Sequence, residues 1–141
     1  MSLANLEKIG RLKSHVATSD EIVRLLAAAK RNLGDANSEG ISDETRFDAA
    51  YKTIMQCALA GLAAAGYRPA TDVPGHHQIM IQSLPVTLGV SRETMIVLDA
   101  LRKKRNINDY SGDLLDPESL RVCILEAEAL LATTFTRLQP S

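Results

Sequence analysis

Apolar residues recur every three or four positions through most of this chain, the spacing of one face of an α-helix. The longest apolar stripes follow Ser, Thr or Asp, side chains that favour a helix start. The best strand candidate, residues 85–90, is short and contains both proline and glycine. The pattern therefore predicts an all-α protein, an antiparallel helical bundle with no sheet.

Six helices are expected, with approximate ranges 3–14, 18–33, 42–66, 75–84, 92–109 and 116–137. Thr18 or Ser19 caps the second helix and Ser42 caps the third, while Asp116-Pro117 is a strong start for the sixth. Pro85 is expected to end the fourth helix. The second, third, fifth and sixth helices would form the bundle, with the two short ones as accessories.

Length and composition favour a single helical domain over residues 1–141, because 141 residues with 45% hydrophobic content suffice for one core. The formal net charge is -1, which argues against a generally basic nucleic-acid binder. Any phosphate contact must therefore come from a local patch. The N-terminus lacks a signal-peptide core and no apolar run is long enough for a membrane span, so a cytoplasmic protein is expected.

Cys57 and Cys123 fall inside expected helices without a CxxC motif or a Cys/His ligand spacing. Two reduced thiols packed as small hydrophobic groups are the expectation, and a disulfide between them stays open. Nothing in the sequence indicates a metal or a cofactor.

The most informative segment is residues 94–112. Val97, Leu98 and Leu101 form one stripe of the fifth helix, and the next turns of that stripe bring Arg105 and Asn108. An arginine that continues an apolar stripe needs a carboxylate, a carbonyl, a dimer partner or a bound anion, because burying its charge alone is costly. We therefore expect Arg105 to bind an anion or to lie in a dimer interface.

Further candidates surround Arg105 in the sequence. Arg102 and Lys104 precede it in the same cationic run and would help to bind an anion. His76 and His77 begin the fourth helix; adjacent helical residues point about 100° apart, so the two are poorly placed to chelate one metal. One of them facing Arg105 would supply a base. Tyr110, near the end of the fifth helix, could hydrogen-bond phosphate.

A homodimer is expected from a second apolar line on the fifth helix, formed by Ile96, Ala100 and Ile107. A helix that is apolar on two sides is usually covered on both. The third helix is also rich in alanine and glycine, which permit close approach of a neighbouring backbone.

The order and spacing of several motifs resemble the HEPN superfamily over roughly residues 20–135: S42-x3-R46-x3-A50-Y51, A65-G66-Y67-R68, H76-H77 and L101-R102-K103-K104-R105-N106-x3-Y110. The resemblance implies an antiparallel bundle of four to six helices, commonly a homodimer. Many members are ribonucleases, often toxins or partners of small nucleotidyltransferases, and others are inactive modules that bind nucleotides or RNA.

The family's active motif contains an arginine, a polar residue and a histidine. Arg105 and Asn106 match the first two, whereas the histidine position holds Tyr110. Tyrosine has an ordinary pKa of ~10 and is a poor general base at neutral pH. The resemblance therefore implies a module that binds RNA or nucleotide phosphate with weak or absent catalysis, and a possible antitoxin or nucleotidyltransferase partner.

Three alternatives stay open. The first is an active, metal-independent ribonuclease that uses Tyr110, His76 or His77. The second is a non-enzymatic interaction module in which Arg105 is neutralised internally, for example by Asp109 or Asp113. The third, a nucleic-acid-binding regulator, is less favoured because no helix-turn-helix spacing with a basic recognition face is evident.

Overall fold

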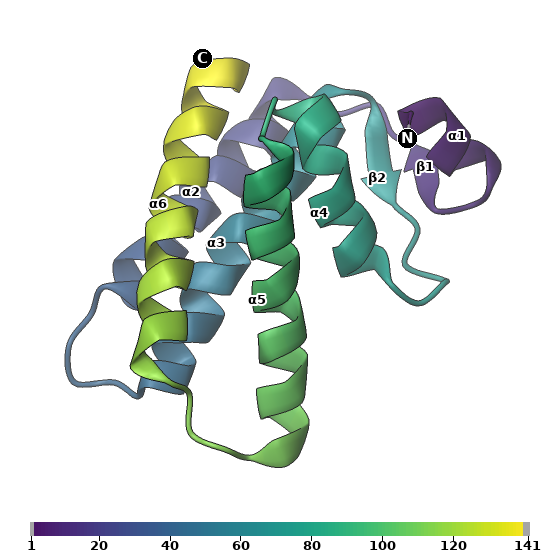
Figure 1. The fold of residues 1–141 in the computed structure, drawn as a ribbon. Coiled ribbons are helices and arrows are strands. Elements are labelled where there is room, and N and C mark those ends of the chain that lie inside the picture. Colours follow the sequence, from purple (N-terminus) through teal and green to yellow (C-terminus); the bar gives the residue numbers. More distant parts are fainter. Residues whose placement is uncertain (1, 140–141) are drawn as a thin grey trace.

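The computed structural model describes residues 2–139 and confirms the all-α class. This part of the chain forms six helices and one small two-stranded sheet, arranged as in Figure 1. In chain order they are α1 Leu3–Lys8, β1 Leu12–Ser14, α2 Ser19–Ala36, α3 Asp43–Ala64, β2 Tyr67–Pro69, α4 His76–Thr87, α5 Arg92–Ser111 and α6 Pro117–Leu138.

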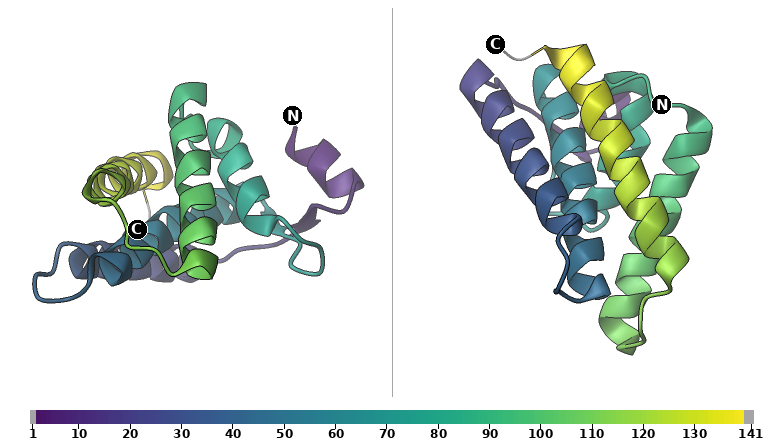
Figure 2. Two further views of the ribbon diagram at one scale, coloured as in Figure 1. Left: turned by 60° about the horizontal axis from the view of Figure 1, so that its bottom comes forward. Right: turned by 90° about the vertical axis from the view of Figure 1, so that its left-hand side faces the viewer.

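Helix α3 lies at the centre and packs against α2, α4 and α6 (Figure 2). Its small residues let these neighbours approach closely: Ala50, Ala58, Ala60 and Gly61 are all buried. A Cβ atom on Gly61 would lie 3.0 Å from Cγ of Leu88, just after α4. The alanine- and glycine-rich face of α3 is therefore covered within the same chain.

Helix α5 packs mainly against α4 and makes fewer contacts with α3 and α6. Leu98 and Leu101 of the predicted stripe are buried, whereas Val97 is 36% exposed. Helix α5 thus leaves Val97 in the open groove between α5 and α6. Its opposite apolar line is also uncovered, with Ile96 and Ile107 both exposed.

The predicted first helix over 3–14 and the predicted absence of a sheet were both wrong. Helix α1 ends at Lys8, and Gly10 adopts a left-handed backbone with φ 79°. Leu12–Ser14 then pairs antiparallel with Tyr67–Pro69. Leu12 is buried by this pairing. Leu12 is thus an apolar residue because a distant segment buries it, and its spacing from Ile9 does not indicate a continued helix.

The cap predictions are confirmed where the structure tests them. Side-chain oxygens of Thr18, Ser42 and Asp116 accept hydrogen bonds from backbone N–H groups at the starts of α2, α3 and α6. Pro85, however, does not end α4, which continues to Thr87. A proline inside a helix forfeits one backbone hydrogen bond. Burial of Leu84 and Leu88 on either side of Pro85 favours continuing the turn.

Candidate functional site

The cationic run of α5 is matched by carboxylates. Asp99 lies 2.9 Å from Arg102 Nε and 3.5 Å from Lys103 Nζ, since it lies three and four residues before them on the same helix. Asp116, the cap of α6, lies 2.8 Å from Lys104 Nζ. Hydrogen bonds from Lys104 and Ser119 hold the pKa of the Asp116 carboxyl well below its usual range. These pairs reduce the local positive charge.

Arg105 reaches across to α3. Its Nε lies 3.3 Å from Oδ1 of Asp48, and its guanidinium carbon lies 5.0 Å from the centroid of the Tyr51 ring. Asp48 and Tyr51 are three residues apart and therefore share one face of α3. The carboxylate and the aromatic ring together fix the direction of Arg105. The alternative of an internal counterion for Arg105 is met by Asp48, rather than by Asp109 or Asp113, the two examples named from the sequence.

His77 joins this cluster from α4. Its Nδ1 lies 3.1 Å from the Tyr51 hydroxyl oxygen. The His76 ring packs edge-on against the His77 ring with centroids 4.7 Å apart. The structure thus brings His77 and Arg105 to the same tyrosine, although 28 positions separate them in the sequence. The contact of His77 with Tyr51 is compatible with the alternative that one histidine lies on the Arg105 side of the bundle.

Burial sets the protonation states of Tyr51 and His77. Burial raises the pKa of Tyr51 to about 12, although the charges of Arg105 and Arg102 act in the opposite direction. Burial, followed by the effects of His76, Arg105 and Arg102, lowers the pKa of His77 below its ordinary value. At neutral pH the cluster therefore contains a protonated phenol and a neutral imidazole beside two arginine cations.

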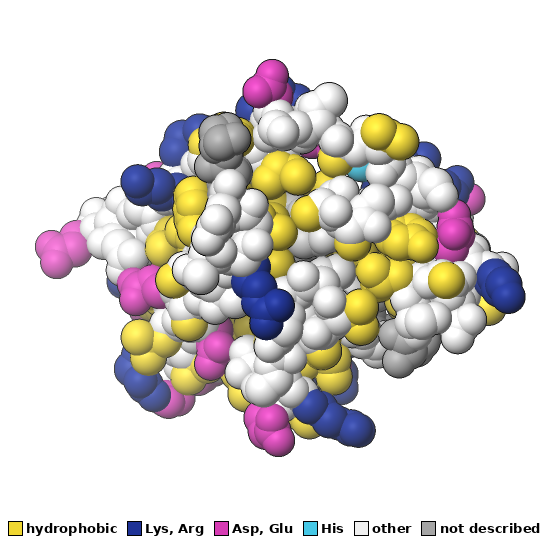
Figure 3. Space-filling view, turned by 90° about the horizontal axis from the view of Figure 1, so that it is seen from above, with side chains coloured by type: hydrophobic (Ala, Val, Ile, Leu, Met, Phe, Trp, Pro, Cys, Tyr) yellow, Lys and Arg dark blue, Asp and Glu magenta, His cyan; other side chains and the backbone are white. Residues whose placement is uncertain are grey.

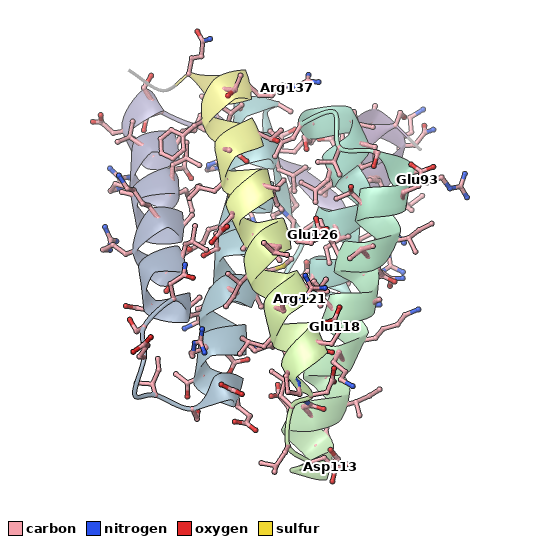
Figure 4. The ribbon with its side chains drawn as sticks, turned by 60° about the vertical axis from the view of Figure 1, so that its left-hand side comes forward. Glu93, Asp113, Glu118, Arg121, Glu126 and Arg137 are labelled. Atoms are coloured by element: carbon pink, nitrogen blue, oxygen red, sulfur yellow. The ribbon has the colours of Figure 1, made fainter. Side chains whose placement is uncertain are left out.

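An open cavity of about 360 Å³ adjoins Arg105 between α3 and the end of α5. Asn108 lines it, as predicted for a residue on the Arg105 stripe. The remaining lining is mostly acidic and apolar: Glu44, Phe47, Asp48, Asp109, Gly112, Asp113 and Leu115. Asp113 lies in the connection between α5 and α6, at the lower end of the molecule in Figure 4. This acidic lining disfavours a polyanion and restricts anion binding to the arginine side of the cavity.

Asn106 and Tyr110 are not brought into the cluster. Both are exposed, and the Tyr110 side chain is 93% exposed. Neither lines the cavity beside Arg105. Their predicted catalytic role stays a prediction, and the geometry gives it no support.

Three contact residues of the arginines and His77 were not anticipated. Asp48 pairs with Arg105, Asp99 pairs with Arg102, and Tyr51 contacts both Arg105 and His77. Tyr51 was placed in the apolar stripe of the third helix, and it is indeed buried. One available signal was the spacing of Asp99 and Arg102, three residues apart on one helix. The other contacts join α3, α4 and α5, so sequence spacing could not show them.

Comparison with protein-family models and with curated proteins finds no match to this chain. Among residues 2–139, no three His, Cys, Asp or Glu side chains are arranged to hold a metal ion. No helix in this part of the chain is both long and apolar enough to cross a membrane.

Proposed function

We propose that this protein is a homodimeric, HEPN-like helical module that binds a nucleotide or RNA phosphate through Arg105, with weak or absent catalysis. One observation carries the proposal: among the described residues, Arg102 and Arg105 each make their side-chain hydrogen bond through Nε alone. No buried side-chain nitrogen or oxygen of a non-exposed residue in this part of the chain lacks a partner, so the unpaired Nη groups of both arginines are accessible to solvent. Two oriented guanidinium groups are suited to bidentate phosphate binding.

The charge distribution favours a small phosphate ligand or a short RNA segment over a long polyanion. Seen from above, lysines and arginines are scattered among acidic side chains and do not form one patch (Figure 3). Along the side of α6 shown in Figure 4, Glu118, Arg121 and Glu126 alternate in sign. Extended nucleic acid needs several neighbouring phosphate contacts, which the sides seen in these two views do not offer.

The dimer part of the proposal is supported by an apolar groove between α5 and α6. It has a volume of about 370 Å³ and is lined largely by Ile96, Val97, Ala100, Leu101 and Val122. Lys104 and Glu118 border it, so the groove runs next to the cationic part of α5. A second copy packed there would cover the uncovered apolar line of α5. A small nucleotidyltransferase or antitoxin partner is proposed from the HEPN resemblance alone.

The test is isothermal titration with AMP and with a short single-stranded RNA, using wild-type protein, Arg105→Ala and Lys103→Ala. Lys103 is the matched control because its substitution removes one charge from the same helix at an exposed position. Arg105→Ala should weaken binding about 10-fold or more, as expected for a lost charge-assisted hydrogen bond. Lys103→Ala should change affinity only slightly. Arg105→Lys should restore part of the affinity, since lysine lacks the planar fork.

Wild-type binding should weaken as salt increases, because phosphate contacts displace counterions. If Arg105→Ala lowers the melting temperature but leaves the affinity for AMP and RNA unchanged, the Arg105–Asp48 pair is structural. That result would support the alternative of a non-enzymatic interaction module. If AMP and RNA both fail to bind the wild-type protein, the proposed function is wrong.

The position of His77 favours a second candidate, a metal-independent ribonuclease. A neutral imidazole beside two arginines is a suitable arrangement for acid–base catalysis next to a stabilised phosphate. RNA cleavage in the presence of EDTA that is lost in both His77→Gln and Arg105→Ala would establish this function. Cleavage that needs Tyr110 but not His77 would instead support the tyrosine mechanism.

A further inference from the structure

We propose that Tyr51 is a positioning residue that holds His77 in its Nε2–H tautomer, which makes the imidazole a hydrogen-bond donor to the phosphate bound at Arg105. This inference rests on the proposed function and deepens it. It assigns the direction of the hydrogen bond between Tyr51 and His77, and of the one between His77 and the phosphate. It also implies that His77 does not act as a general base while the Tyr51 contact is made.

The first step concerns the Tyr51 proton. Among the described residues, the only hydrogen-bond partner of the Tyr51 hydroxyl is Nδ1 of His77, at 3.1 Å. Tyr51 is only 2% exposed. If the hydroxyl accepted from an Nδ1–H group, its own proton would have no acceptor in this buried position, which is unfavourable. The phenol therefore donates to Nδ1.

The second step concerns the tautomer. A neutral imidazole carries one N–H and one acceptor nitrogen. Since Nδ1 accepts from Tyr51, the proton must lie on Nε2. Burial and the neighbouring cations keep His77 neutral, because they lower its pKa, and burial keeps the phenol protonated. The contact therefore fixes one of two possible tautomers.

The third step concerns whether the Nε2–H group of His77 is accessible to a ligand. Nε2 of His77 makes no hydrogen bond to another described residue, and His77 is half-buried. Because no buried polar side-chain atom in this part of the chain is unpaired, Nε2 reaches the surface. It is an available donor on a side chain that contacts the same tyrosine as Arg105, and His77 does not line the acidic cavity on the Asp48 side of Arg105. Phosphate oxygens accept hydrogen bonds from such donors and from guanidinium groups alike.

Tyr51 contacts His77 through its hydroxyl and Arg105 through its ring, so substitutions can separate the two contacts. Tyr51→Phe removes the hydroxyl but keeps the ring under Arg105, 5.0 Å from its guanidinium carbon. Tyr51→Leu removes both. The first variant should disturb only His77, whereas the second should disturb His77 and Arg105.

The decisive experiment is ¹⁵N NMR of the histidine rings in the full chain without ligand, with His77→Gln to assign the signals. Wild-type His77 should show the Nε2–H tautomer alone. Tyr51→Phe should give a mixture of tautomers and a higher His77 pKa, because the hydrogen bond to neutral Nδ1 is lost. Nδ1–H or mixed tautomers in the wild type, or an unchanged signal in Tyr51→Phe, would overturn the inference.

Titration with AMP then tests the donor role, with adenosine as the control that lacks phosphate. AMP should shift the His77 Nε2–H signal, and His77→Phe, which keeps a ring but removes the donor, should weaken AMP binding about threefold to tenfold, the range for one neutral hydrogen bond. If AMP binding needs Arg105 but leaves the His77 signal unmoved, the inference is wrong and the proposed function survives. If AMP does not bind at all, both the proposed function and the donor role fail.

Discussion

The Nε atom of Arg105 lies 3.3 Å from Oδ1 of Asp48, so the arginine proposed to bind phosphate already has an internal counterion. Asp48 competes with any phosphate for this guanidinium. Asp48→Asn should therefore strengthen AMP binding measured by calorimetry. Both side chains are partly exposed, so the free energy of unfolding should change by less than about 1 kcal/mol.

Asp109→Asn is the matched control for Asp48→Asn. Asp109 lines the same cavity but forms no ion pair with Arg105. Its removal should strengthen AMP binding less than removal of Asp48. Weaker binding in Asp48→Asn would show instead that Asp48 is needed to orient Arg105.

Stability should depend on pH through His77. In the unfolded chain His77 titrates near its ordinary pKa of 6.5, and folding lowers that pKa. The unfolded state therefore binds more protons below pH 6.5, and the free energy of unfolding falls as pH decreases through that value, levelling off below the folded pKa.

Urea denaturation of the wild type and of His77→Gln, between about pH 7.5 and about pH 5.5, isolates this contribution. The wild type should lose more stability over that interval than the variant. His76, Arg102 and Arg105 act on His77 in the same direction, since each disfavours its charged form. Identical pH dependence in both proteins would contradict the prediction.

Two glycine-to-alanine substitutions should have opposite signs. A Cβ on Gly61 would lie 3.0 Å from Leu88 Cγ and 3.1 Å from Thr87 Oγ1, and Leu88 is fully buried. Overpacking should outweigh the helix propensity of alanine, so Gly61→Ala should lose about 1 kcal/mol. A Cβ on Gly34, in α2, would meet no other atom within 4 Å, and Gly34→Ala should gain about 0.5–1 kcal/mol. Thermal denaturation measures both.

The two cysteines should be unreactive in the folded protein. Both are free and buried. Burial raises the pKa of the Cys57 thiol to about 11 and that of Cys123 to about 12, so little reactive thiolate forms at neutral pH. Mass spectrometry should detect no rapid alkylation by iodoacetamide in buffer, and alkylation of both cysteines in denaturant. Fast labelling of either thiol in buffer would contradict this.

Dimerisation should depend on the apolar groove between α5 and α6. Ile96 lines the groove and is 57% exposed, so Ile96→Glu should prevent association without unfolding the chain. Leu114→Glu is the matched control, because Leu114 is an equally apolar, 88% exposed residue that does not line the groove. Light scattering should show a dimer for wild type and Leu114→Glu, and a monomer for Ile96→Glu. A monomeric wild type would remove the dimer from the proposal.

Local information in the sequence was enough for the four long helices, α2, α3, α5 and α6. Ser42 and Asp116 cap their own first turns, and the apolar stripes of α3 and α6 recur at helical spacing, so no distant contact is needed to recognise them. The same information identified Arg105 as an arginine in an unusual position. It also placed Asn108 beside Arg105, because a three-residue spacing on one helix determines neighbours.

Only the tertiary structure decided which groups meet Arg105. Asp48 and Tyr51 come from α3 and His77 comes from α4, and their approach depends on how three helices pack. The path of Leu12–Ser14 was decided in the same way, since a strand of three residues exists only through its pairing with Tyr67–Pro69. Helices form from hydrogen bonds and side-chain spacing within one segment, whereas strand pairing and the polar cluster depend on contacts between segments far apart in the chain.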